Sequence, residues 1–340
     1  MRRRIKSLDS LKGICIFLIV IYHTADGILR VENTAMDLIY KYGGDLGNTF
    51  FFMISGFLIT ATFRNHVLQN KISLFEFMKG RISKIYLPYL LSSLCMSCII
   101  IKQAEISALT LKNIVLNLLL ITTGWVEDIY PFNFPCWFLS VLILMYLIWF
   151  IVTKKYGENS WYVYLMLIIC GFIFEKLCLT IPFMYYHTGE GLVPFFGGCI
   201  IYKICQDVQK NQLIHISLTL MSTTVFFLIY AKNVGFESAV GEWKYAWYFL
   251  VTPTMILLAV YIQPIRKILE SRVIYWLCGD ISMVVYFWHA PYTKIFSCLI
   301  ENRLANSTCL LFVLYILSLI VFAKAYVFLK NKMVKKDGIY

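Results

Sequence analysis

Apolar residues recur along the chain in runs long enough to cross about 30 Å of hydrocarbon, and short polar segments separate them. The pattern predicts an all-α, polytopic transmembrane helix bundle that forms a single domain over residues 1–340. We expect about ten spans, at residues 11–25, 46–63, 85–101, 136–152, 161–179, 191–202, 213–231, 245–262, 281–299 and 308–329. The apolar run 114–123 is too short to span alone, so we expect it to be interfacial or re-entrant.

The first apolar run follows three arginines, as the core of a secretory signal peptide would. Lys12 interrupts the entry to this run, however, and His23-Thr24-Ala25 would make a poor cleavage site. We therefore expect the run to remain in the protein as its first membrane helix.

Composition agrees with a membrane protein, because 60% of the residues are hydrophobic and only 15% are charged, whereas a soluble domain carries roughly 25% charged residues. The net charge of +12 would suit nucleic acid, but the cations lie in short segments between apolar runs, so no nucleic-acid partner is expected. The eleven cysteines are scattered, mostly through apolar runs. Even the CxxC pair Cys95 and Cys98 lies in an expected lipid-embedded helix, and we expect neither a disulfide framework nor a metal site.

Basic residues divide unequally between the two sides of the predicted bundle. With ten spans and the N-terminus inside, twenty lysines and arginines fall in inner segments and seven in outer segments. Cytoplasmic loops are enriched in these cations, so both termini are predicted to be cytoplasmic, with the protein in the cell (inner) membrane. The outer segments carry acidic residues instead: Asp26, Glu32, Asp37, Asp45, Glu127, Asp128, Glu190, Glu237 and Glu242.

Ionisable residues inside expected spans are candidates for function, because their burial in hydrocarbon is costly. Lys12 and His23 are eleven residues apart, so they share one helical face at a separation of about 16 Å along the axis. Lys12 alone could equally be an interfacial lysine that extends to the headgroups. For His23 we favour a functional role, since a deep imidazole is a ready proton acceptor near neutral pH.

Two further segments are candidate binding regions. Lys79, Arg81 and Lys84 precede the third span, where they could hold phosphates or simply follow the inner-side preference of cations. In the ninth span, Ser282, Tyr286 and His289 have i, i+4, i+7 spacing and line one face, which predicts a polar stripe towards the bundle interior. Such a stripe could also serve only to form hydrogen bonds between helices. In the second span, the Ser55-Gly56 pair taken alone favours close helix packing.

Taken in order, these segments closely resemble the motifs of the acyltransferase-3 family of membrane acyltransferases. Lys12, ten intervening residues and His23 match that family's Arg/Lys-x10-His motif, and Phe51–Ile59 is similar to its Phe-Phe-x-Ile-Ser-Gly-Phe-Leu-Ile stretch. The segment from Arg81 to Lys84 resembles its Arg-x-x-Arg motif. Lys84 stands in place of the second arginine, which removes a planar bidentate donor but keeps the charge.

Two later segments complete the resemblance. The stretch Asn133–Leu139 resembles the family's Trp-Phe-Leu entry to a middle helix. Gly279–Pro291 resembles its Gly-x-x-Ser-x-x-x-Tyr-x-x-His-x-Pro segment. The matching motifs extend over almost the whole chain.

The resemblance implies transfer of an acyl group, usually acetyl, from cytoplasmic acyl-CoA to a hydroxyl of an extracytoplasmic polysaccharide or glycolipid. It implies that His23 accepts the proton of the attacking hydroxyl or carries the acyl group transiently. The implied catalytic residues are His23, Lys12 and Arg81. The residues implied to anchor the co-substrate acetyl-CoA are Lys79, Arg81 and Lys84. Those implied to shape the substrate pocket are Ser55, Ser282, Tyr286, His289 and Trp137.

Other functions fit the same pattern of polar residues in a membrane. Transfer of succinyl or longer acyl groups is the alternative within the enzyme class. A transporter or flippase for a lipid-linked glycan would also need intramembrane polar residues and broken helices, and a membrane sensor without activity is a third interpretation. The sequence leaves the acceptor glycan and the oligomeric state open.

Overall fold

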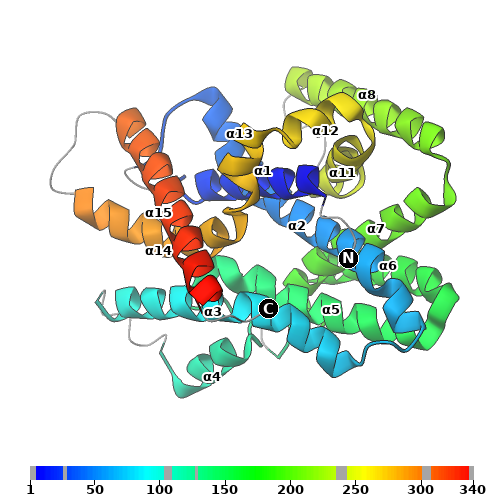
Figure 1. Ribbon diagram of the computed structural model, residues 1–340, viewed down its shortest axis with the longest axis horizontal. Helices are drawn as coiled ribbons and strands as arrows, with labels where there is room; N and C mark the ends of the chain where they lie inside the picture. The colour runs from blue at the N-terminus through cyan, green and yellow to red at the C-terminus, as the bar shows by residue number, and fades with distance from the viewer. Residues whose placement is uncertain are drawn as a thin grey trace.

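The protein is built from helices throughout the part of the chain that the structure describes. The computed structural model describes residues 5–25, 29–102, 109–126, 129–234, 243–300 and 308–336, and these residues contain no β-strand. This agrees with the predicted all-α class (Figure 1). The predicted outer residues Asp26, Glu127, Asp128, Glu237 and Glu242 lie outside the described residues.

The helices follow one another with short connections. The first half of the chain forms α1 (Lys6–Tyr22), α2 (Thr34–Leu68), α3 (Leu74–Lys102), α4 (Leu111–Leu119), the 3₁₀ turn η2 (Phe134–Cys136), α5 (Trp137–Tyr156), η3 (Gly157–Asn159) and α6 (Ser160–Leu177). The second half forms α7 (Tyr186–Asp207), α8 (Lys210–Val234), α10 (Trp243–Ala246), the π-helical turn η4 (Trp247–Val251), α11 (Thr252–Tyr261), α12 (Gln263–Leu269), α13 (Arg272–Ile274), the π-helical turn η5 (Tyr275–Gly279), α14 (Ser282–Ile300) and α15 (Thr308–Lys336).

Several of these helices are long and apolar enough to cross a membrane. Among the described residues, five segments meet this condition, and the number rises to seven if each of two bent helix pairs is one span. One of the five, Phe134–Leu177, contains both α5 and α6, for which the sequence predicts separate spans. The protein is therefore a multi-pass membrane protein, while the expected ten spans and the cytoplasmic termini stay predictions.

Helix α5 lies at the centre of the molecule and supplies much of its core. Val141, Met145 and Trp149 on this helix are completely buried. They belong to one apolar cluster with residues of α2, α7 and α14, including Phe52 and Phe195. The core therefore joins helices from both halves of the chain.

The outer helices present apolar side chains to their surroundings. In α8 and α15, which lie at opposite edges of the molecule in Figure 1, Phe226 is 73% exposed and Val321 is 67% exposed. Contiguous exposed apolar surface of this kind marks contact with a membrane. These apolar faces are therefore suited to contact with lipid.

Close contacts of the backbone hold α2 against α7. A Cβ atom added at Gly56 would lie 1.8 Å from the carbonyl oxygen of Phe195, and one added at Gly198 would lie 1.9 Å from that of Met53. Small residues allow membrane helices to approach this closely. Gly56 thus serves helix packing, as the Ser55-Gly56 pair alone suggests.

This contact predicts that Gly56→Ala lowers stability. Overpacking of a tight contact costs about 1–3 kcal/mol, so we expect a lower midpoint of thermal unfolding in detergent. The matched control is Gly80→Ala in α3, where an added Cβ meets nothing within 4 Å and should stabilise by about 0.5–1 kcal/mol. Equal midpoints for the two variants would contradict the proposed packing role.

Candidate active site

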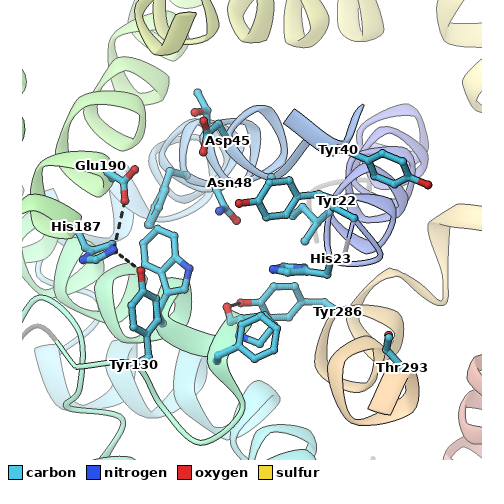
Figure 2. A pocket seen from close by; sticks show the side chains of 18 of the residues that line it. Tyr22, His23, Tyr40, Asp45, Asn48, Tyr130, His187, Glu190, Tyr286 and Thr293 are labelled. Carbon is cyan, nitrogen blue, oxygen red and sulfur yellow. Dashed lines mark hydrogen bonds and ion pairs between the residues drawn. The ribbon is translucent and has the colours of Figure 1, made fainter. Parts of the chain in front are cut away.

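A cavity of about 1190 Å³ opens among segments that are far apart in the sequence. Its walls come from the C-terminal end of α1, the N-terminal half of α2, the segment 130–137, the N-terminal end of α7, the α10–η4 segment and α14. Figure 2 shows polar and aromatic side chains directed into it from several sides. In the predicted topology, the other wall segments lie at the outer ends of their spans, whereas the wall residues of α14 extend from Tyr286, near the inner end of the predicted span 281–299, to Cys298.

Three of the residues predicted for the site line this cavity. His23 follows the last residue of α1 and its ring points into the cavity, close to Tyr286 of α14 (Figure 2). Trp137, the first residue of α5, also lines it. His289 is fully buried behind this wall and contacts His23. The structure therefore brings the two deep histidines together, although 266 positions separate them.

The two histidines form a hydrogen-bonded pair with a defined direction. Nδ1 of His289 lies 2.7 Å from the carbonyl oxygen of Tyr286 and 3.3 Å from that of Val285. A carbonyl oxygen only accepts, so this Nδ1 carries the proton, and in a neutral His289 the other nitrogen, Nε2, is an acceptor. His23 Nδ1, at 3.2 Å from that Nε2, is then the donor. A neutral His23 is thereby left with its lone pair on Nε2.

Helix α14 is fixed against the segment before α5 by two buried hydrogen bonds. The Tyr286 hydroxyl donates to the carbonyl oxygen of Pro135 at 2.6 Å. The Asn133 side-chain amide donates to the carbonyl oxygen of Phe287 at 2.9 Å and to the Ser92 hydroxyl at 3.0 Å. These bonds join the two motif segments, and they set the position of His289 one turn further along α14.

Other predicted residues lie away from the cavity. Lys12 is on the opposite end of α1, where its ammonium is 3.5 Å from the Asp9 carboxylate. Ser282 is at the first residue of α14, about 10 Å along the axis from His289. Ser55 lies one turn beyond the cavity residue Phe52 on α2 and hydrogen-bonds to Tyr146. None of these three lines the cavity.

Arg81 is half-buried near the other end of α2. Its guanidinium lies 4.3 Å from the ring centroid of Phe63 and 6.0 Å from that of Phe77, and it is in electrostatic contact with Tyr146. Within the described segments, its buried Nε finds no hydrogen-bond acceptor. Phe52, the last cavity residue on α2, and Phe63 are 11 residues apart on one continuous helix, so this cation is about 16 Å from the cavity along α2.

Lys79 and Lys84 lie close to Arg81 in sequence but are exposed at the surface. The Lys79 ammonium is 6.0 Å from the ring centroid of Phe75. The predicted cationic group therefore consists of one half-buried arginine and two exposed lysines. It is separate from the histidine pair.

A second polar group in the cavity wall was not predicted from the sequence. The Lys244 ammonium pairs with the carboxylate of Glu190, lies 3.3 Å from that of Glu175, and donates to the Tyr186 hydroxyl at 2.8 Å. The Tyr248 hydroxyl donates to Glu175 at 2.9 Å. The sequence analysis identifies Glu190 only as an acidic residue of an outer segment. Its position directly before the predicted span 191–202 is the one feature from which its place in the cavity wall could have been predicted.

Next to this group, His187 connects the wall to the loop before α5. Its Nε2 lies 3.0 Å from the Tyr130 hydroxyl and 3.9 Å from the Glu190 carboxylate. Its ring centroid is 4.9 Å from that of Trp137. In the described ranges, no group of three or more His, Cys, Asp or Glu side chains could hold a metal ion.

A membrane helix bundle with a large polar cavity and a buried histidine pair at its wall defines an integral membrane protein with the groups of a catalytic site. A family model described as "Acyltransferase domain" matches residues 5–326. The chain therefore belongs to the acyltransferase-3 family, which confirms the resemblance of its motifs.

Curated relatives agree with this family. The chain is 22% identical over 329 residues to "O-acetyltransferase OatA" of Staphylococcus aureus strains NCTC 8325 / PS 47, COL and MRSA252. The match covers 85% of this chain and 50% of each relative, so the chain spans about half the length of the curated relatives it matches. No solved structure matches it significantly.

Proposed function

We propose that this protein transfers an acetyl group from cytoplasmic acetyl-CoA to a hydroxyl of an extracytoplasmic polysaccharide or glycoconjugate. The observation that carries the proposal is the histidine pair, because it directs one imidazole nitrogen with a free lone pair to the wall of a large cavity. The relatives' printed name, O-acetyltransferase, supports acetyl as the acyl group. Succinyl transfer would use the same groups in a wider pocket.

In the proposed reaction, His23 Nε2 accepts the proton of the acceptor hydroxyl while the hydroxyl oxygen attacks the thioester carbonyl carbon of acetyl-CoA. The new C–O ester bond forms, the C–S bond breaks, and the CoA sulfur takes up the proton from His23. In the alternative route, the same lone pair first attacks the thioester, and the acetyl group then passes from the imidazole to the hydroxyl. Both routes require the tautomer that His289 favours.

At the inner end of the bundle, Arg81 is proposed to hold the phosphates of acetyl-CoA. Its guanidinium rests on aromatic rings, and its buried Nε has no acceptor within the described part of the chain. Ser55 and Tyr146 lie between Arg81 and the cavity residue Phe52. These residues support a route along α2 by which the acetyl-bearing arm of acetyl-CoA reaches His23.

His23→Ala should lower acetyl transfer by about 10²–10⁴-fold, the range for loss of a general base. The assay follows acetyl-CoA consumption and release of CoA by the purified protein in proteoliposomes. The matched control is His215→Ala, which removes an exposed histidine of α8. A folded His23→Ala protein with the wild-type rate would refute the assignment. Glycan movement across the bilayer without CoA release would point instead to a transporter.

His289→Ala should lower kcat roughly 10- to 100-fold and leave the KM for acetyl-CoA unchanged, because His23 would keep its backbone contact with Ile19 but lose the acceptor on α14 that orients its ring. His289→Gln keeps an acceptor oxygen and should recover part of the rate. A purely structural role for His289 would instead reduce the amount of folded protein and give no such split between kcat and KM. Steady-state kinetics on protein purified by size exclusion separates these results.

Arg81→Ala should raise the KM for acetyl-CoA about 10- to 100-fold, the equivalent of a hydrogen bond to a charged group. Arg81→Lys keeps the charge and should show a smaller increase. Lys71→Ala, at an exposed lysine before α3, is the control and should leave this KM unchanged. An unaltered KM in Arg81→Ala would mean that the phosphates bind elsewhere.

A further inference from the structure

Two polar side chains of α2 project into the cavity beside the charged wall group. Asp45 and Asn48 are three residues apart, so they lie on one face of the helix. Both line the cavity, and Figure 2 shows them directed into the same space as His23, with Glu190 and His187 on the facing side. A carboxylate and an amide are thus presented together.

These two side chains differ from the charged group around Lys244 in that they have no hydrogen-bond partner within the described segments. Lys244, Glu175 and Glu190 satisfy one another. By contrast, no residue in the described segments hydrogen-bonds to the Asp45 carboxylate or the Asn48 amide. Polar groups in a membrane protein cavity need partners. The Asp45 carboxylate and the Asn48 amide are therefore available to a ligand in the cavity.

The carboxylates indicate which substrate group suits this part of the wall. Asp45 is in electrostatic contact with both Glu190 and Lys244, and Glu175 also pairs with that lysine. Around Lys244, one ammonium therefore faces three carboxylates, while a second cation, Lys294 of α14, also lines the cavity. The Asp45 carboxylate accepts hydrogen bonds from hydroxyl or amino groups.

The volume of the cavity and its aromatic lining also suit a sugar. At about 1190 Å³, the cavity exceeds the roughly 300–1,000 Å³ typical of small-ligand pockets, so it has room beyond an acetyl group. Trp137 and Tyr130 line it across from α2. Their rings offer apolar faces on which the C–H side of a sugar ring can pack.

We propose that Asp45 and Asn48 form the acceptor subsite, which binds neighbouring hydroxyl groups of a neutral or amino sugar and holds the reacting hydroxyl towards His23. Asp45 accepts a hydrogen bond from one hydroxyl, and the Asn48 amide both donates and accepts with the next. Lys244 is a positioning residue that keeps the carboxylates of Glu175 and Glu190 in place. This inference rests on the proposed function and names the substrate class of the same site.

The first test measures binding without any acyl donor. The probe is base-deacetylated surface glycan from cells that lack the gene, and the readout is its Kd for purified protein, followed by titration calorimetry. Asp45→Asn and Asn48→Ala should each weaken binding about tenfold or more. Because neither side chain has a hydrogen-bond partner in the described segments, these changes break no internal hydrogen bond. Asn65→Ala, at an exposed position of the same helix, is the control.

The second test uses steady-state kinetics in proteoliposomes. Asp45→Asn should raise the KM for the glycan and leave both the KM for acetyl-CoA and the CoA release without glycan unchanged. A rise in the KM for acetyl-CoA alone would assign this wall to the donor and overturn the inference. Unchanged glycan affinity in both variants, or no binding of the glycan to the wild-type protein, would also overturn it. Wild-type protein that binds glycan but consumes no acetyl-CoA would contradict the proposed function and leave the subsite standing.

Discussion

The high free-energy cost of polar groups in hydrocarbon determines where polar side chains lie in this protein. The outer faces of α8 and α15 carry apolar side chains, and the ionisable groups of one cavity wall are paired with one another. Lys244 between Glu175 and Glu190 is the clearest case. Breaking such a pair would leave an uncompensated charge, so these groups also hold α6, α7 and α10 in register.

The positions of the protons on the histidine pair depend on backbone carbonyl groups more than on other side chains. The proton on His289 Nδ1 is fixed by the carbonyl oxygen of Tyr286, which belongs to the same helix. That helix is in turn fixed by hydrogen bonds to Pro135 and from Asn133. The tautomer of His23 therefore depends on contacts at three separate parts of the chain. This arrangement gives a physical reason for the polar positions in both motif segments.

The hydrophobic pattern located the apolar part of most helices but not their polar ends. Helix α2 begins at Thr34, well before the expected start at 46. The prediction missed these first turns because Asp37, Lys41 and Asp45 lower their hydropathy. Helix α7 likewise extends from Tyr186 to Asp207, beyond the expected run 191–202. The cavity is built from these polar ends. Periodicity and hydropathy therefore singled out the histidines but missed Asp45, Asn48 and Glu190 as residues of the cavity wall.

The pairing of His23 with His289 illustrates the other limit of sequence reasoning. Each histidine is recognisable as a deep imidazole, but contact across 266 positions depends on how α1 and α14 pack. The same packing separates His23 from Arg81, since the two lie near opposite ends of a bundle whose long helix α2 spans both regions. Under the proposed function, phosphates and acceptor therefore bind at different ends, and only the acyl-bearing arm has to pass between them. The donor end offers the Arg81 guanidinium to phosphates, and the acceptor end offers a carboxylate and an amide to sugar hydroxyls, so each end suits only one of the two substrates.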